Sequence, residues 1–340
     1  MTESAVEEDF QTLAGQYRRE LLAYCYRMLG SVHDAEDLVL ETYLRAWRAY
    51  DRFEGRSSVR TWLYRIATNA CLTALEGKGR RPLPSGLGAP SADPSAELVE
   101  RPEVPWLEPV PSAMVGASPA DPASVVTSRA SIRLALITAL QYLPSRQRVV
   151  LIMRDVLGWR AAEVAELLGI TTVAVNSMLQ RARAQIGELA PAEDDVTEPD
   201  TPQQRELLER YVAAFEKYDT AALVKLFSAD AVWEMPPFDG WYQTPDAIYR
   251  LVENKCPAKC AGDLRLLPTE ANGQPAFGMY LRDEQGAYQA FQLHVLHLAD
   301  PAAGSAADRA GELAIDHVAS FFDLTLFGKF GLPDTLPAGS

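Results

Sequence analysis

Ten of the 23 prolines in this 340-residue chain lie between Pro82 and Pro122, where they prevent regular helices and strands. They are mixed with Gly, Ser, Ala and acidic residues and show almost no apolar periodicity, which is typical of a linker. A second, shorter acidic stretch lies at 191–201. The chain is therefore predicted to contain folded units at 1–82, 126–190 and 202–335, joined by linkers at 83–125 and 191–201.

Charge divides along the same boundaries. The net charge of −14 excludes a uniformly basic nucleic-acid binder. Residues 126–190, however, hold eight basic and four acidic residues, whereas residues 202–340 hold 11 basic and 19 acidic ones. The acidic total therefore conceals one basic module.

Nothing in the sequence predicts export or membrane insertion. The first ten residues carry four acidic residues and lack the basic and apolar regions of a secretory signal. Apolar stretches such as 134–140 are far shorter than the roughly 18 residues that span a bilayer. The four cysteines are too few and too dispersed for a disulfide framework. We therefore expect a cytoplasmic protein with reduced thiols and no membrane segment.

The first unit is predicted to be all-α, because residues 10–75 follow helical periodicity with breaks at Gly30-Ser31 and 51–58. Its last helix follows Ser57-Ser58 and carries rings, guanidinium groups and an amide on or near its outer side. These candidates are Arg56, Ser58, Arg60, Trp62, Tyr64, Arg65 and Asn69. Rings stack on bases and arginines neutralise phosphates, so this face suits an unstacked nucleic-acid strand. The alternative is that Trp62 and Tyr64 pack on a neighbouring helix.

The basic module contains the spacing of a helix-turn-helix. Ala165 is small where two helices would cross, Gly169 stands in the turn, and Val175 and Met178 point inward from the second helix. The outward residues of that helix would meet base edges and phosphates: Thr171, Thr172, Val173, Asn176, Ser177, Gln180, Arg181 and Arg183. An αα-hairpin within a helical core is the alternative, but the concentration of positive charge favours DNA binding.

Four sequence blocks resemble the extracytoplasmic-function (ECF) sigma factors of bacterial RNA polymerase, which keep only sigma regions 2 and 4. The blocks are Asp34–Trp47, Ser58–Ala70, Leu143–Arg148 and Leu179–Arg183. The resemblance extends over about residues 1–190. It implies that 1–82 is region 2, that 126–190 is region 4, and that the protein is a promoter-specificity subunit without enzymatic activity or cofactor.

The same resemblance assigns roles to the outward residues. Asp37, Glu41 and Arg45 would dock on the clamp helices of the polymerase β′ subunit, and the helix after Ser58 would capture the melted −10 element. Region 4 would contact the β flap and read the −35 element. Asn176 and Met178 stand where basic residues are common in the family, which implies a weaker or different −35 contact.

The linker at 83–125 is long enough for this geometry. It extends to at most roughly 140 Å at about 3.3 Å per residue, whereas two helical turns of DNA span about 70 Å. Its acidity suits a nucleic-acid mimic in the transcript channel of the polymerase. A plain disordered tether remains the alternative.

The third unit is predicted to be α+β, since helical patterns at 207–215, after Asp219 and at 245–253 accompany strand patterns at 231–235, 276–282, 288–298 and 312–323. The arrangement resembles the SnoaL-like cone of polyketide cyclases and ketosteroid isomerases, which some ECF sigma factors carry at the C-terminus. Such cones enclose a pocket. Its candidate lining is Trp233, Met235, Trp241, Tyr242, Tyr280, His294 and His317.

A packed pocket, or one that senses an unknown small ligand, is favoured over a catalytic one. His317 shares a strand face with Ile315, whereas Asp316 lies on the opposite face, so this neighbouring acid-base pair does not converge. Cys256 and Cys260, with two histidines at 294 and 297, have too loose a spacing for zinc. We therefore predict no metal site.

Three functions are weighed. A sigma factor whose acidic C-terminal domain regulates it through contact with regions 2 and 4 is the leading hypothesis. A SnoaL-like isomerase or hydrolase fused to a DNA-binding region is the second, and a helix-turn-helix repressor that acts without polymerase is the third.

Overall fold

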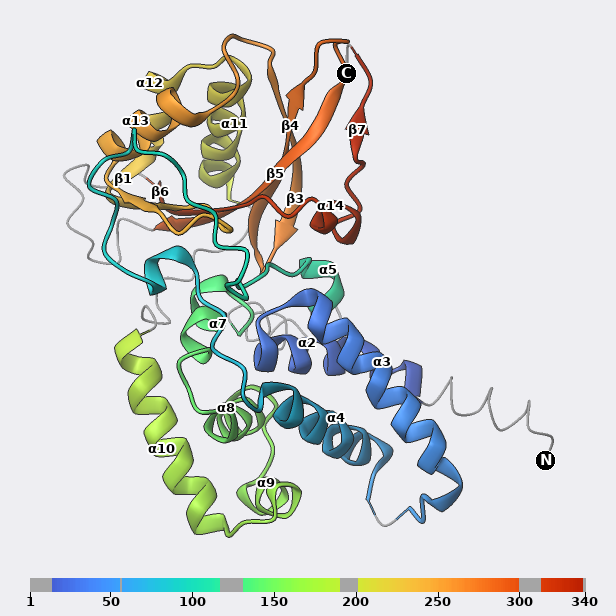
Figure 1. The fold of residues 1–340 in the computed structure, drawn as a ribbon. Helices are drawn as coiled ribbons and strands as arrows, with labels where there is room; N and C mark the ends of the chain where they lie inside the picture. Colours follow the sequence, from blue (N-terminus) through green and yellow to red (C-terminus); the bar gives the residue numbers. More distant parts are fainter. Residues whose placement is uncertain (1–13, 56, 117–130, 190–200, 300–312, 339–340) are drawn as a thin grey trace. The chain divides into compact units, whose positions relative to one another are not determined.

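The computed structural model describes residues 14–55, 57–116, 131–189, 201–299 and 313–338, and the chain divides into two compact units (Figure 1). The helical unit joins Met1–Arg81 with Leu107–Pro191. The C-terminal unit joins Pro82–Trp106 with Ala192–Ser340. The two helical segments that the sequence separates by a linker thus share one unit, and the first part of that linker belongs to the other.

The described residues of the first part of the helical unit form the helices α2 (Arg18–Leu29), α3 (Val32–Ala49) and α4 (Val59–Leu75). Gly30 ends α2 with φ 69°, a left-handed conformation that glycine adopts without steric cost. Ser31 then caps α3 by accepting a hydrogen bond from the Asp34 N–H. Ser58 caps α4 in the same way through the Thr61 N–H. These caps explain the two breaks that the sequence predicts.

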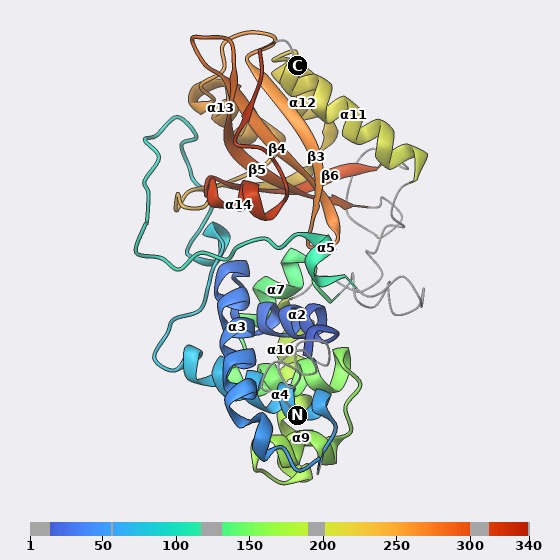
Figure 2. The same cartoon turned by 90° about the vertical axis from the view of Figure 1, so that its right-hand side faces the viewer.

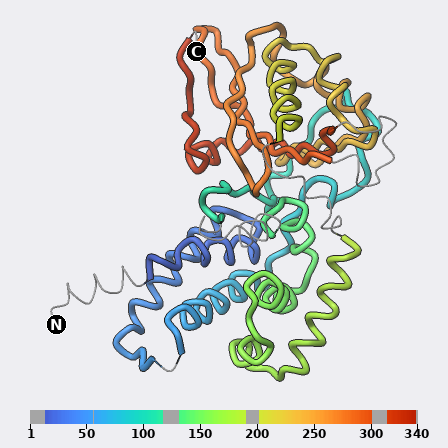
Figure 3. The backbone as a smooth tube through the Cα atoms, turned by 180° about the vertical axis from the view of Figure 1, so that it is seen from behind, coloured from blue at the N-terminus to red at the C-terminus, as the bar shows by residue number. Residues whose placement is uncertain are grey.

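The second part of the helical unit consists of short helices followed by one long helix. They are α5 (Ser112–Val115), α7 (Leu134–Leu140), α8 (Ser145–Leu151) with a π-helical turn at Ile152–Val156, α9 (Ala161–Leu168) and α10 (Thr172–Leu189). The blue and green helices of this unit lie together in the front and rear views (Figure 3). Arg148 ties the two parts, because its guanidinium donates to the Met28 carbonyl and, at 2.8 Å, to Gln141 Oε1.

The C-terminal unit packs helices against one mixed sheet. Its helices are α11 (Pro202–Glu216), α12 (Thr220–Leu223), α13 (Pro245–Lys255) and α14 (Thr325–Lys329). Its strands are β1 (Phe227–Glu234), β2 (Trp241–Gln243), β3 (Leu264–Ala271), β4 (Gln274–Arg282), β5 (Tyr288–Ala299), β6 (Ala314–Phe321) and β7 (Thr335–Leu336). The strand order is β2-β1-β6-β5-β4-β3, with β7 paired to β5. β1 and β6 are parallel, and the other neighbours are antiparallel.

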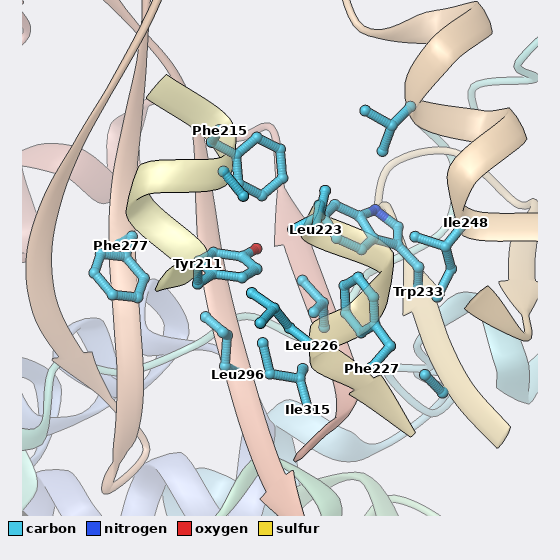
Figure 4. Packing of buried hydrophobic residues seen from close by; sticks show 14 of the residues in the cluster. Tyr211, Phe215, Leu223, Leu226, Phe227, Trp233, Ile248, Phe277, Leu296 and Ile315 are labelled. Carbon is cyan, nitrogen blue, oxygen red and sulfur yellow. The ribbon is translucent and has the colours of Figure 1, made fainter. Parts of the chain in front are cut away.

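The core of this unit lies between α11–α13 and one face of the sheet (Figure 4). Tyr211 of α11 packs on Phe277 of β4, Phe215 of α11 packs on Tyr211, and Trp233 of β1 lies beside Ile248 of α13. The other face of the sheet is covered in part by α14. A Cβ at Gly278 would lie 2.6 Å from Cδ1 of Leu332, so a larger residue there would require the Leu332 side chain to move.

Three strands, β2, β3 and β7, escaped the sequence analysis, and β7 is only two residues long. β3 carries Pro268, which weakens a strand pattern, and the structure places β3 at the sheet edge where proline is tolerated. Asn272-Gly273 joins β3 to β4 with φ values of 56° and 68°, the conformation of a two-residue hairpin turn. β2 is only three residues long.

Residues 82–106 run along the C-terminal unit as an ordered segment, the teal trace beside α13 in Figure 2. The Ser85 N–H donates to Glu234 Oε2 at 2.6 Å, and Trp241 Nε1 donates to the Gly88 carbonyl at 2.9 Å. Farther along, Arg101 Nε donates to Asp239 Oδ2 at 2.8 Å. The segment is therefore not a free tether in the structure, and its placement in the transcript channel of the polymerase stays a prediction.

Among the described residues, no single helix is long and apolar enough to cross a membrane. The one helix pair that meets the length and composition criteria together, α9 with α10, is bent by 103° at its break.

Candidate nucleic-acid interface

The predicted single-strand face on α4 is present in part. Trp62 and Arg65 are half-buried and Asn69 is exposed, so all three have surface available. Trp62 packs on Phe53 with ring centroids 4.7 Å apart. The hydroxyl of Ser58 serves as the helix cap, and Arg56 lies outside the described residues.

Tyr64 is the clear departure from the prediction, since it is fully buried rather than outward. Its ring meets Tyr24 at 5.2 Å and Trp159 at 5.4 Å, both edge-to-face. Burial raises the pKa of Tyr64 and excludes its ionised form. The alternative of packing against a neighbouring helix therefore holds for this residue.

The two described arginines of this face, Arg60 and Arg65, have carboxylate partners. Arg60 Nε lies 2.9 Å from Glu20 Oε2, and its guanidinium stacks over the Tyr64 ring at 5.1 Å. Burial lowers the pKa of Arg60, but the bond to Glu20 outweighs that effect and raises it. Arg65 donates to Glu166 Oε1 at 2.8 Å, across to α9. DNA phosphates would compete with these carboxylates for the same donors.

The helix-turn-helix is formed by α9 and α10, whose axes differ by 103°. Ala165 is buried at the crossing, and Gly169 takes φ 65° in the turn. Thr171 accepts from the Ala174 N–H at 3.2 Å and so starts α10. Val175 is fully buried as predicted, whereas Met178 is half-buried and Leu179 fills the second inward position.

The side chains on the outward face of α10 are exposed to solvent. Val173 is 77% exposed. The other exposed candidates are Thr171, Thr172, Asn176, Ser177, Gln180, Arg181 and Arg183. Arg183 is paired with Asp155 at 2.7 Å, and Arg181 donates to the Ser177 carbonyl at 3.3 Å.

A second outward face lies on α3. Asp37 and Arg45 are exposed as predicted, and Glu41 accepts from Arg45 at 2.5 Å. Leu40 and Leu44, which the sequence analysis missed, are 61% and 49% exposed on the same face. The sequence did carry a signal for them: Leu40 and Leu44 are four residues apart, so they share the helix face of the outward charges Asp37, Glu41 and Arg45.

The pocket candidates of the C-terminal unit divide between the two sheet faces. Trp233, Met235 and Tyr242 belong to the helix-covered core, and His294 is fully buried beside the Trp233 ring at 5.2 Å. Trp241 lies at the sheet edge, where it holds residue 88. Tyr280 packs on Phe327 of α14, on the opposite face.

His317 points away from the core, contrary to the alternation argument. Leu298 pairs with Ile315 but His297 pairs with His317, so Asp316 is an extra residue that bulges from the strand. The bulge reverses the alternation. His317 Nε2 therefore meets Glu234 Oε1 at 2.7 Å, and Asp316 bonds His297 Nδ1 at 2.6 Å.

Opposed effects set the ionisation of this outer pair. Burial raises the pKa of Glu234, but bonds from His317 and the Ser85 N–H outweigh it and lower the pKa. Burial lowers the pKa of His317, but the Glu234 carboxylate outweighs it and raises the pKa. The two groups thus form an ion pair on the outer face of the sheet.

The interior histidine is neutral. Burial lowers the pKa of His294 to about 3. Its Nδ1 bonds the Tyr211 hydroxyl at 2.8 Å, whereas within the described residues His294 Nε2 and Trp233 Nε1 have no hydrogen-bond partner. No group of three His, Cys, Asp or Glu side chains suited to a metal ion occurs in the described ranges.

Family models match each of these parts. Sigma-70 region 2 matches residues 13–81, Sigma-70 region 4 matches 133–186, and the Nuclear transport factor 2 (NTF2) domain matches 203–279. Over 329 residues the chain is 58% identical to the ECF RNA polymerase sigma factor SigG of Mycobacterium tuberculosis (strain ATCC 25618 / H37Rv), covering 96% of this chain and 85% of that protein. The chain belongs to the ECF sigma factors.

Two further comparisons, one of sequence and one of fold, cover different shares of the chain. The ECF RNA polymerase sigma-E factor of Escherichia coli (strain K12) is 29% identical over 180 residues, which cover 53% of this chain and 85% of that one. The crystal structure of the Mycobacterium tuberculosis extracytoplasmic function sigma factor SigJ shares the fold, with a TM-score of 0.55 and 23% identity over 96% of this chain and 99% of that chain. In this ECF sigma factor, α2–α4 thus form region 2, α7–α10 form region 4, and the C-terminal unit carries an NTF2-like, SnoaL-like domain.

Proposed function

We propose that this ECF sigma factor binds core RNA polymerase in the cytoplasm, recognises the −10 and −35 promoter elements, and initiates transcription without enzymatic turnover of its own. The observation that carries the proposal is the outward face of α10, on a helix bent by 103° from α9 and begun by a threonine cap. Such a helix presents its first turns to the major groove of DNA.

Region 4 is proposed to read the −35 element through the first turns of α10. Thr172, Val173, Asn176 and Ser177 are exposed there, and an amide or hydroxyl reads base edges while an apolar side chain meets a thymine methyl group. Arg181 and Arg183 follow one turn later and suit phosphates. No lysine or arginine lies among the first-turn residues, so the base contacts rely on neutral groups.

Region 2 is proposed to capture the melted −10 strand through α4. Trp62 supplies a ring for stacking, Arg65 a charge and Asn69 an amide. Tyr64 takes no part in the described conformation, because its ring is enclosed by Tyr24 and Trp159.

The exposed face of α3 is proposed as the contact with the clamp helices of the polymerase β′ subunit. Leu40 and Leu44 supply apolar area, and Asp37, Glu41 and Arg45 surround it with charge. An apolar centre with a polar rim is the usual organisation of a protein interface. Region 4 is proposed to contact the β flap through α8.

The C-terminal domain is proposed to regulate the sigma factor. An unknown small ligand is proposed to bind near His294 and Trp233, since each has a fully buried polar atom without a partner among the described residues. A small neutral molecule with a hydrogen-bond acceptor and donor would satisfy both.

The proposal is tested by transcription in vitro with core polymerase and a cognate promoter. Asn176→Ala should lower the yield by about ten-fold, since a good base contact is worth about 1–3 kcal/mol. Glu188→Gln, an exposed change at the other end of α10, is the control and should leave the yield unchanged. Equal yields from the two variants would contradict the assignment of α10 to promoter reading.

A further inference from the structure

The outward side chains of α10 and its cap fall into two groups, and the first group is already engaged within region 4. The Thr171 hydroxyl caps the helix, and Arg183 makes two bonds to Asp155, at 2.7 and 2.9 Å. Arg181 donates at 3.3 Å to both the carbonyl and the hydroxyl of Ser177. Both arginines of this face therefore have partners inside the protein.

The second group consists of two carboxamides and two side chains that carry methyl groups. Thr172, Val173, Asn176 and Gln180 are exposed, and the polar side chains among them have no hydrogen-bond partner within the described residues. Residues three and four apart share a helix face, so Val173, Asn176 and Gln180 form one row along α10. This row starts in the first turn, the part of such a helix that meets base edges.

Each kind of free side chain has a preferred base in the major groove. A carboxamide donates to adenine N7 and accepts from the adenine N6 amino group, and an apolar side chain packs on the methyl group of thymine. Guanine presents two acceptors, for which arginine or lysine is the usual partner. No arginine or lysine lies at 171–180. The free chemistry of α10 therefore matches A·T base pairs and not G·C base pairs.

The spacing of the row fits neighbouring base pairs. Val173 and Asn176 are three residues apart, which is about 4.5 Å along the helix axis at about 1.5 Å per residue. Successive base pairs are about 3.4 Å apart. The two side chains therefore span about one base-pair step, and they can contact the same base pair or two adjacent ones.

We propose that Asn176 and Val173 are specificity-determining residues that select A·T base pairs in the −35 element. Asn176 binds an adenine through its carboxamide, and Val173 packs on a thymine methyl group at the same or an adjacent base pair. The inference deepens the proposed function as a sigma factor and rests on it. Region 4 discriminates against G·C pairs at these positions, because guanine has two acceptors in place of the donor and acceptor of adenine, and neither guanine nor cytosine carries a methyl group.

Selection of promoter duplexes by the holoenzyme, full-length protein with core polymerase, tests both contacts. The library keeps the −10 region of a start site mapped with the same holoenzyme and randomises the −35 region. Wild type should enrich an adenine at one position and a thymine in the same or an adjacent base pair. Asn176→Ala should lose only the adenine preference and Val173→Ser only the thymine preference, so each variant is the control for the other. Asn176→Arg should change the adenine preference to guanine.

Single-group changes in the selected DNA measure each contact by itself. Uracil in place of the thymine removes one methyl group and should weaken binding by wild-type holoenzyme about four-fold. 7-Deazaadenine in place of the adenine removes the N7 acceptor and should weaken binding about five-fold. Val173→Ser should be insensitive to uracil alone, and Asn176→Ala should be insensitive to 7-deazaadenine alone.

The outcomes separate this inference from the proposed function. Guanine at the selected positions of wild type, or adenine and thymine preferences that survive in both variants, would overturn the inference and leave the proposed function in place. A wild-type holoenzyme that enriches no −35 sequence and starts no transcripts would overturn the proposed function, and the inference with it.

Discussion

Trp62 and Tyr64 lie two residues apart on α4, yet the structure gives them opposite roles. Trp62 is half-buried and contacts Phe53, whereas Tyr64 is fully buried between Tyr24 and Trp159. Replacing each by alanine should therefore separate DNA capture from stability.

The expected sizes follow from burial. Tyr64→Ala should cost about 3–5 kcal/mol of unfolding free energy, the usual cost of truncating a buried aromatic ring. Trp62→Ala loses the burial of about half a tryptophan side chain, about 100 Å² of apolar surface, and should lower the unfolding free energy by about 2.5 kcal/mol. In DNA capture, Trp62→Ala removes a stacked ring worth about 1–3 kcal/mol, or about ten-fold or more in promoter opening. Tyr64→Phe keeps the packing and loses only a long 3.5 Å hydroxyl contact with Glu20.

Stability would be measured by urea unfolding, monitored through hydrogen exchange in α4. Promoter opening would be measured by permanganate footprinting of the −10 region. We expect Trp62→Ala to reduce opening under conditions where region 2 remains folded, and Tyr64→Phe to open promoters like wild type. Normal opening by Trp62→Ala together with impaired opening by Tyr64→Phe would refute the reasoning, because the buried ring would then be the one that meets DNA.

Three further predictions concern single positions. Gly169→Ala should destabilise region 4 by about 1 kcal/mol, because φ 65° strains alanine where a Cβ has open space, whereas Gly187→Ala in α10 should not destabilise it; hydrogen exchange of α10 measures both. Folding raises the pKa of His317 and lowers that of Glu234, so their pairing should stabilise the C-terminal domain fully between about pH 4.5 and 6.5. This stabilisation should be lost as the pH rises through the folded pKa of His317, and also as the pH falls through the folded pKa of Glu234. Glu234→Gln should abolish that dependence in thermal unfolding. Because the folded pKa of His294 is about 3, stability should fall by about 1.4 kcal/mol per unit as pH drops below 6.5, and a His294→Leu variant that kept this slope would contradict the assignment.

Local sequence signals predict the helical parts well. Gly30 and Ser31 mark the α2–α3 break through a left-handed turn and a cap, and Ala165 and Gly169 mark the helix-turn-helix through sterics at adjacent positions. These features depend on residues close in sequence. The family resemblance, the two helical regions and the α+β C-terminal domain are confirmed by the family models and the relatives.

Features that depend on distant residues could not be predicted in the same way. Tyr64 is buried by Trp159, which lies far along the chain, and no periodicity within α4 reveals that contact. Asp316 bulges because of its pairing with β5, so simple alternation places His317 on the wrong face. The acidic connector has the composition of a tether, yet its order comes from partners such as Glu234 and α3.

The most direct test of the central claim is start-site mapping in vitro with core polymerase, genomic DNA and this protein. We predict a discrete set of start sites preceded by shared −35 and −10 sequences, which appear only when both core and the protein are present. Tight, sequence-specific binding to duplex DNA without core, together with no new start sites when core is added, would contradict the account.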